Sequence, residues 1–361
     1  MSIIKRKYEF AGARILNYSY IRSKTLSYHL TFEQIISDLK NKVYHPIYFL
    51  TGEEPFFIDE ISDYIAEHVL DETEKEFNQT VIYGRDIDVD GIISEAKRFP
   101  MMANHQVVII KEAQTIKNID NLAPYLEQPL RSTILVICYK YKKLDKRKKF
   151  TKDVAKNGVL FESRKLFENK VQGWITAHLK EDGYKITPPA LVMLTEYLGS
   201  DLGTIANELE KLMVNIPKGS EIDADNVEAN IGISKEFNRF ELQKALGTKN
   251  VVKANQIINY FASNPNSNPA VLTISSLVSY FSKLVLYHKL PDKSKNNVAS
   301  MLKVNPYFVG EYEIAARNYQ PEQLLGVIEN LRVYDMRSKG VENVSVTGDE
   351  LVKELVYKIL H

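Results

Sequence analysis

The sequence is poor in the residues that build covalent or metal-bound frameworks. Its 361 residues include a single cysteine, Cys138, and seven histidines, none of which forms a His-x-x-x-His pair. A lone cysteine excludes a disulfide framework and a cysteine-rich zinc site, and it is typical of a reducing compartment. We therefore expect no bound metal, and we expect a cytoplasmic location.

Neither sign of charge dominates the chain. Forty-seven lysines and arginines stand against 46 aspartates and glutamates, which leaves a formal net charge of +1. Without a global field, contact with nucleic acid has to come from local basic patches. The sequence also lacks an apolar run that approaches about 18 residues, so we predict no transmembrane helix and no membrane partner.

What the sequence does contain is enough apolar material for folded domains. Hydrophobic residues make up 44% of the chain, and a chain of this length is expected to form two or three domains. Residues 1–26 are basic but have no continuous apolar segment, so they do not form a secretory signal. We interpret them as a disordered leader or the product of an over-long start site, with an organelle-type transit peptide as the alternative.

The distribution of apolar runs predicts an α/β region followed by helices. Strand-like runs occur at residues 47–50, 80–83, 107–110, 133–138 and 159–161, with helical patterns between them. This is β-α-β spacing, and near-continuous apolar strands indicate a parallel sheet covered on both faces. After residue 162 only helical stripes remain. We predict domains at residues 27–165, 166–235 and 236–361.

A phosphate-binding loop is missing where this arrangement would place one, after the first strand. Such a loop has the pattern G-x-x-x-x-G-K-[ST], because its N–H groups and lysine bind phosphates and its hydroxyl binds Mg²⁺. Residues 52–57 instead read GEEPFF. Two carboxylates repel a triphosphate, and the proline has no N–H to donate.

A second defect lies at the end of the third strand. The sequence from residue 107 reads VVIIKEA, so Lys111 stands where an ATPase has the aspartate that holds Mg²⁺. A cation at that position disfavours a bound metal. Together the two defects predict an ATPase-like scaffold that has kept its shape without the chemistry.

Five segments occur in an order that is typical of one family. They are YFLTGEEPFFIDE at 48–60, FPMMANHQVV at 99–108, LDKRKK at 144–149, GSDL at 199–202 with ELEKL at 208–212, and YDMRSKG at 334–340. Through them the chain, from about residue 31 onward, resembles the delta subunit of the bacterial DNA polymerase III clamp loader. The resemblance implies an AAA+-like parallel-sheet domain without a phosphate loop, a helical lid domain and a C-terminal helical collar domain for oligomerisation.

The resemblance also implies a function and partners. The family's delta subunit does not hydrolyse ATP; it binds and opens the ring-shaped sliding clamp for loading onto primed DNA, together with ATPase subunits and a delta-prime-like subunit. It implies no cofactor. The residues alone leave open a divergent ATP-dependent P-loop-like enzyme. A delta-prime-like subunit is disfavoured because its cysteine zinc ligands and Ser-Arg-Cys motif are absent.

By position, the family's clamp-binding element corresponds to Met101 and Met102. In the family this element is an exposed apolar pair, commonly Leu-Phe, that enters a hydrophobic pocket of the clamp. Methionine is flexible and polarizable, which suits an adaptable pocket. From the sequence alone, the alternative is that both are core residues flanking a strand.

A basic segment follows the fourth strand. Residues 140–149 contain seven lysines or arginines and one aspartate, and clustered cations bind DNA by releasing counterions. The alternative is a solvated helix face. Candidate DNA contacts are Lys146, Arg147, Lys148 and Lys149, with Arg337 and Lys339 near the end of a collar helix.

Overall fold

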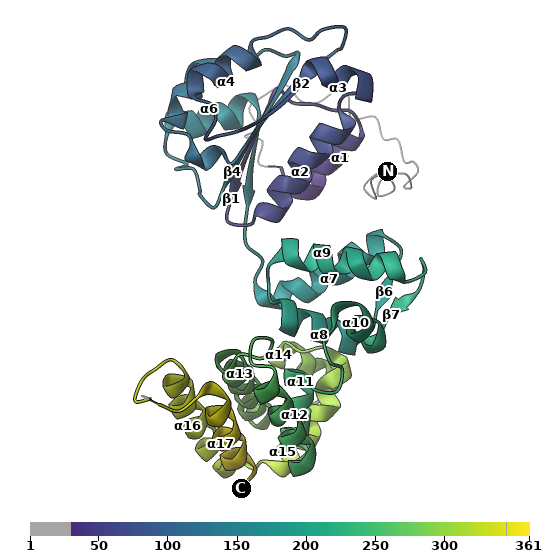
Figure 1. Ribbon diagram of the computed structural model, residues 1–361, viewed down its shortest axis with the longest axis vertical. Helices are drawn as coiled ribbons and strands as arrows, with labels where there is room; N and C mark the ends of the chain where they lie inside the picture. The colour runs from purple at the N-terminus through teal and green to yellow at the C-terminus, as the bar shows by residue number, and fades with distance from the viewer. Residues whose placement is uncertain (1–29, 344) are drawn as a thin grey trace. The chain divides into compact units, whose positions relative to one another are not determined.

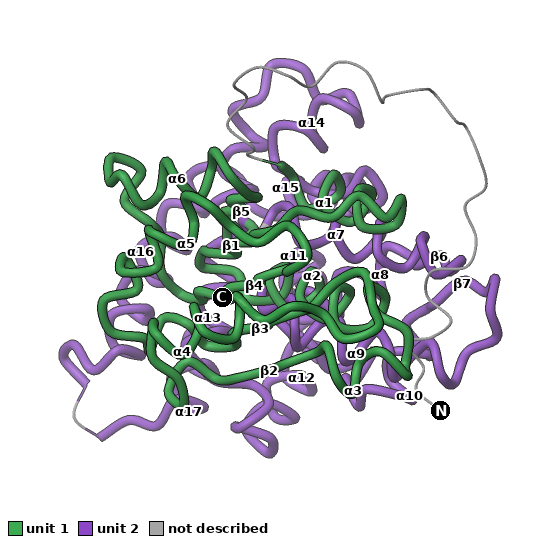
Figure 2. The backbone as a smooth tube through the Cα atoms, turned by 90° about the horizontal axis from the view of Figure 1, so that it is seen from above, with its two compact units in different colours: residues 1–166 green, residues 167–361 purple. Residues whose placement is uncertain are grey.

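The computed structural model describes residues 30–343 and 345–361 (Figure 1). The predicted leader, residues 1–26, lies outside the described residues. The chain divides into two compact units, Met1–Leu166 and Phe167–His361 (Figure 2).

The first unit is built on a parallel sheet. Its strands are β1 (Ile47–Gly52), β2 (Gln79–Tyr83), β3 (Gln106–Lys111), β4 (Thr133–Lys140) and β5 (Val159–Ser163). Its α-helices are α1 (Phe32–Lys40), α2 (Pro55–His68), α3 (Glu72–Asn78), α4 (Val89–Ala96), α5 (Ala123–Glu127) and α6 (Lys149–Asn157), with short 3₁₀ turns at Ala113–Thr115 and Ile119–Leu122. The strand order is β2-β3-β4-β1-β5, and all four pairings are parallel.

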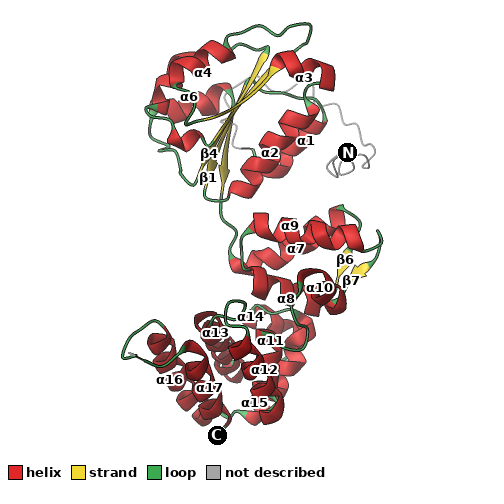
Figure 3. Cartoon of the chain, viewed as in Figure 1, coloured by secondary structure: helices red, strands yellow, loops and turns green. Residues whose placement is uncertain are grey.

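Burial on both faces of the sheet explains why the strands are continuously apolar. Along β1 every residue is buried. Phe49 faces a core shared with α4, α5 and α6, whereas Leu50 faces a core shared with α1 and α2. Figure 3 shows these helices on opposite sides of the yellow strands. The predicted parallel sheet covered on both faces is confirmed.

The second unit is helical apart from one small ribbon. It begins with α7 (Glu168–Glu181), β6 (Lys185–Ile186), α8 (Pro188–Leu198), α9 (Leu202–Asn215), β7 (Glu221–Ile222) and α10 (Ala224–Ile231). It continues with α11 (Arg239–Gly247), α12 (Val251–Ser263), α13 (Ala270–Lys289), α14 (Lys295–Leu302), a 3₁₀ turn at Pro306–Phe308, α15 (Val309–Asn318), α16 (Pro321–Ser338) and α17 (Gly348–Leu360). The parallel pair β6 and β7 corrects the expectation of helices alone; two-residue strands are too short to produce a periodic pattern.

The long helix α13 lies at the centre of the helical core. Ile274, Phe281 and Leu284 are fully buried and pack with residues from α11 to α17. Within its 20 residues, an 18-residue window has a mean hydropathy of 1.5, so by length and composition it could cross a membrane. Serine and threonine interrupt its apolar run, so the sequence shows no continuous apolar stretch of about 18 residues here. One face of the helix is buried in the helical core. The split at residues 235 and 236 stays a prediction.

Candidate functional site

The loop between β1 and α2 is closed by the chain's own carbonyl groups. Gly52 donates its N–H to the Lys142 carbonyl oxygen at 3.0 Å, and Glu53 donates to the Ser163 carbonyl oxygen at 2.9 Å. Gly52 has φ of 135°, and a Cβ there would lie 1.9 Å from the Ser163 oxygen. A phosphate cradle needs free N–H groups at this point. Here the fold already uses two of them.

The N-terminus of α2 carries its own anion. Glu54 is 3% exposed, and its carboxylate accepts the Phe56 N–H at 3.2 Å. The Ser163 hydroxyl donates to the Glu54 carbonyl oxygen at 2.6 Å, which fixes the turn. A helix N-terminus favours a negative charge, and this carboxylate supplies it where a phosphate would otherwise bind. A second anion would be repelled.

Two lysines at the ends of β3 and β4 are neutralised by carboxylates. Lys140 Nζ lies 2.9 Å from Asp59 and 3.1 Å from Glu112, and Lys111 Nζ lies 2.7 Å from Asp63. Burial by itself would lower the pKa of Lys140, but the hydrogen bonds and charges of its two carboxylates raise it. Burial opposes ionisation of Glu112, yet Gln114 and Lys140 keep its pKa below the ordinary value. The network satisfies its own charges.

No metal-binding cluster accompanies this network. Within residues 30–343 and 345–361, no group of three or more histidine, cysteine, aspartate or glutamate side chains is placed to hold a metal ion. Cys138 is buried in the sheet, and burial raises the pKa of its thiol to about 11. The thiol is therefore protonated and unreactive at neutral pH.

The first unit also has an open cleft of about 560 Å³. Its lining includes Phe57 and Phe161 together with four charged residues, Glu33, Lys146, Glu162 and Arg164. Glu162 lies 2.8 Å from Lys146 and 3.6 Å from Arg164, so one carboxylate offsets both cations. The cleft is large enough for a small molecule, but its cations are already paired.

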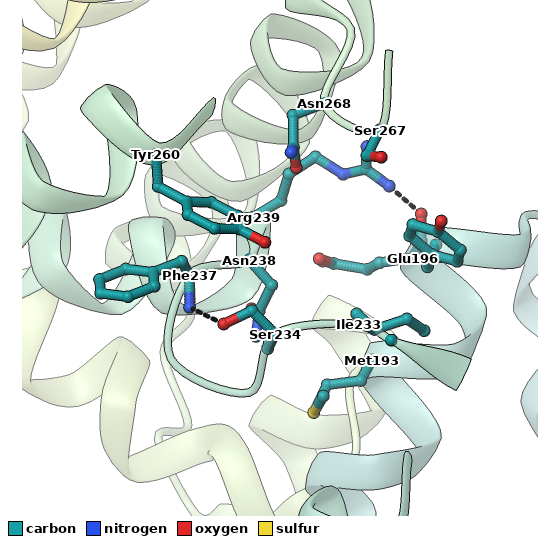
Figure 4. Close-up of a pocket in the computed structure, with 12 residues that line it drawn as sticks. Met193, Glu196, Ile233, Ser234, Phe237, Asn238, Arg239, Tyr260, Ser267 and Asn268 are labelled. Atoms are coloured by element: carbon teal, nitrogen blue, oxygen red, sulfur yellow. Dashed lines mark hydrogen bonds between the residues drawn. The ribbon is translucent and has the colours of Figure 1, made fainter. Parts of the chain in front are cut away.

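A second pocket lies within the helical unit, between α8, the start of α11 and α12 (Figure 4). Its volume of about 50 Å³ holds a few waters and excludes a nucleotide. The Arg239 guanidinium donates to the main-chain oxygen of Glu196. Burial raises the pKa of the Glu196 carboxyl to about 7, although Arg239 and Lys283 oppose the shift. We interpret the Glu196 carboxyl as a buried structural group.

Met101 and Met102 lie on an exposed loop between α4 and β3. Their exposed fractions are 59% and 103%, so neither belongs to the core. Met102 has φ of 55°, a left-handed conformation that is strained for a side chain other than glycine. Phe99, two residues before Met101, is 76% exposed. The loop therefore presents several large apolar side chains to solvent.

The basic segment is a loop, which corrects the alternative of a solvated helix face. Residues 141–148 are not helical, and α6 begins at Lys149. Each candidate cation has a carboxylate partner: Lys146 with Glu162 at 2.8 Å, Arg147 with Asp145 at 3.0 Å, Lys148 with Asp120 at 2.6 Å, and Lys149 with Glu127 at 2.6 Å. The local charge is therefore largely balanced.

The two collar candidates lie at the end of α16, where the sequence placed them. Arg337 lies 3.6 Å from Glu354, and Lys339 lies 2.7 Å from Asp335. Cations are favoured at a helix C-terminus without any DNA. These two residues belong to the second unit, whereas the basic segment belongs to the first.

Sequence reasoning missed Asn78, the last residue of α3. It is 2% exposed, and its side chain bonds the backbone of Met101, 23 residues away. No local pattern marks such a residue, because an asparagine before a strand is also typical of an ordinary turn.

Comparisons with known proteins agree with this architecture. The family model for the DNA polymerase III delta subunit matches residues 48–164. The chain is 29% identical to DNA polymerase III subunit delta of Bacillus subtilis (strain 168) over 314 residues, covering 83% of this chain and 90% of that protein. It is 23% identical to the probable subunit delta of Aquifex aeolicus (strain VF5) over 308 residues, covering 81% and 86%.

A solved structure gives the same result for the fold. The Bacillus subtilis DNA clamp loader delta protein superimposes with a TM-score of 0.51 at 24% identity, covering 91% of this chain and 99% of that chain. The chain thus shares the fold of that protein, with a five-stranded parallel sheet in its first unit. The family model and the relatives narrow the resemblance further: the chain is similar to the delta subunit of DNA polymerase III, and the family model matches residues 48–164.

Proposed function

We propose that this chain is a non-catalytic clamp-loader subunit that binds and opens the sliding clamp through Met101 and Met102. The observation that carries the proposal is the exposure of the pair, 59% and 103%, on a loop whose backbone is strained at Met102. Strain without packing is typical of a functional loop.

The free energy expected from burying Met101 and Met102 fits a pair of anchor residues within a larger interface. Burying two methionine side chains in an apolar pocket contributes about 3 to 6 kcal/mol before the costs of association. That is enough for a hot spot but not for a whole interface, so neighbouring apolar residues have to contribute. Phe99 lies on the same loop and is 76% exposed. Phe77 is 59% exposed and precedes Asn78, whose side chain bonds the backbone of Met101.

The closed phosphate loop supports the non-catalytic half of the proposal. Its N–H groups and the α2 N-terminus are occupied by the chain's own carbonyl and carboxylate groups. In the proposed assembly, ATPase subunits supply hydrolysis and a delta-prime-like subunit completes the ring, in the bacterial cytoplasm. The competing proposal, a divergent ATP-dependent P-loop-like enzyme, requires these groups to be free.

The test is a titration of the M101A/M102A variant against the sliding clamp of the same organism. We expect the dissociation constant to rise about 30- to 1,000-fold, as for a hot spot of about 2 to 4 kcal/mol. Met301, which is 49% exposed on α14, offers a matched control. M301A should bind as the wild type does. Unchanged affinity of the double variant would reject the assignment.

We also propose that primed DNA is contacted through the assembly, with Lys146, Arg147, Lys148, Lys149, Arg337 and Lys339 as the contacts. Exposed ion pairs are worth little, so these cations can exchange a carboxylate for a phosphate at low cost. Replacing the four residues 146–149 by alanine should flatten the salt dependence of DNA binding by the loader. An unchanged slope would remove this segment from the DNA interface.

A further inference from the structure

One buried amide connects the end of α3 to the loop that carries Met101 and Met102. The Asn78 Nδ2 donates to the Met101 carbonyl oxygen at 3.0 Å, and the Met101 N–H donates to the Asn78 Oδ1 at 2.6 Å. The same Nδ2 donates to the Glu74 carbonyl oxygen at 2.9 Å, which holds the side chain against its own helix. Both backbone polar groups of Met101 are thus satisfied by one side chain.

The chemistry of asparagine suits this task. A carboxamide presents one donor group and one acceptor in a plane, as a peptide bond does, so it can form two hydrogen bonds with the backbone of one residue. Aspartate at neutral pH lacks the donor, and serine is too short to reach both groups. At 2% exposure, the amide is also shielded from competing water.

The other end of the loop is anchored separately. The Gln106 Nε2 donates to the Glu95 carbonyl oxygen at 3.1 Å, and the His105 ring packs edge-on against Tyr44 at 5.4 Å between centroids. Met102 and Asn104 lie between these anchors and are exposed. The loop is therefore fixed at both ends while its apolar side chains point away from the core.

We propose that Asn78 is a positioning residue for the clamp-binding pair. It holds the backbone of Met101 so that Met101 and Met102 project in the conformation that the clamp pocket accepts. The inference rests on the proposed function of the pair. Its energetic basis is preorganisation: a loop that is already ordered loses less conformational entropy on binding.

The experiment uses the full chain, the sliding clamp and the variant N78S, which can still bond its own helix but cannot reach both groups of Met101. We expect the dissociation constant to rise about 5- to 30-fold, the effect of losing two hydrogen bonds. Amide hydrogen exchange at Met101, measured without clamp, should become faster. The control is N41S, because the Asn41 side chain makes a similar bond to Ser37, at 2.8 Å, and does not contact the loop. N41S should change neither readout.

A double-mutant comparison separates positioning from general destabilisation. In the M101A/M102A background, N78S should change affinity by less than about 2-fold, because the group it positions is gone. The inference would be overturned if N78S weakened clamp binding equally in the wild-type and M101A/M102A backgrounds. It would also be overturned if N78S bound the clamp with wild-type affinity while M101A/M102A bound it weakly. If N78S does not fold, N78D replaces it in the experiment, because aspartate keeps the acceptor for the Met101 N–H. Either of these two results, obtained with N78D, would overturn the inference.

Failure of the proposed function has a different signature. If M101A/M102A binds the clamp as the wild type does, the clamp assignment is wrong and this inference is wrong with it. If M101A/M102A binds weakly but the Met101 amide of N78S exchanges as slowly as in the wild type, only the anchoring by Asn78 is wrong.

Discussion

Among the residues of the first unit with positive φ, Gly52 and Met102 use this conformation in opposite ways. Gly52, at 135°, lets the backbone approach Ser163 so closely that no side chain fits. Met102 has a strained backbone with φ of 55°. Its side chain is fully exposed, so no packing of that side chain offsets the strain. The first loop uses the conformation to close the position where a phosphate-binding loop would lie, and the second uses it to present a side chain.

The largest effect on the free energy of unfolding is expected from adding a side chain at Gly52. G52A places a Cβ 1.9 Å from a backbone oxygen at a φ that alanine rarely adopts, so we expect a loss of more than about 3 kcal/mol in the free energy of unfolding. Urea denaturation measures it. G173A, at a helical glycine with open space around it, should cost nothing. By contrast M101A/M102A should lose less than about 1 kcal/mol. Similar losses for G52A and M101A/M102A would erase the distinction between the two loops.

The next effect concerns the charge network beside the closed loop. K140M keeps most of the side-chain volume but leaves Asp59 and Glu112 without their shared cation, and we expect about 1 to 3 kcal/mol of destabilisation at pH 7. The pKa of Glu112 is lowered in the fold, so its contribution is present above its ordinary pKa of 4.5 and is lost as the pH falls below that value. K140M removes a lysine that lowers the pKa of Glu112, so the free energy of unfolding should depend less on pH in the acid range. Clamp affinity should be unchanged.

A comparable effect tests a buried charge that is poorly compensated. The pKa of Glu196 is raised from 4.5 to about 7, so the folded state binds a proton that the unfolded state releases. Stability should fall as the pH rises from about 4.5 to 7 and then level off, by roughly 3 kcal/mol in total. E196Q should remove that slope in urea titrations between pH 5 and 8. A slope that survives the substitution would assign it to other groups.

The smallest effect is an expected absence of binding. Because the N–H groups of residues 52 and 53 are engaged, we expect no saturable binding of a fluorescent ATP analogue with Mg²⁺ at micromolar concentrations. E112Q serves as the comparison variant. Saturable binding by the wild type that is lost in E112Q would contradict the closed-site interpretation and favour the enzyme alternative.

Much of the first unit could be predicted from the sequence, and less of the second. Strands β1, β3, β4 and β5 were recognisable because they are buried on both faces, which requires continuous apolar residues. The edge strand β2 has Val81 and Tyr83 exposed, and its β-branched and aromatic residues made it recognisable. The ribbon of β6 and β7 was missed because two residues have no period. The basic segment looked like a helix face, but α6 begins only at Lys149.

The sequence by itself determined that the phosphate-binding pattern is absent after the first strand, that the sheet is parallel, and that an apolar pair precedes the third strand. Only the tertiary structure decided what replaces the nucleotide and what holds the pair. Ser163 closes the loop from 109 residues beyond Glu54, and Asn78 reaches Met101 across 23 residues. Local patterns report which face of an element is buried, because burial follows the period of the element. Hydrogen-bond partners far apart in the chain meet only after the strands have taken their order in the sheet, so no local pattern encodes them.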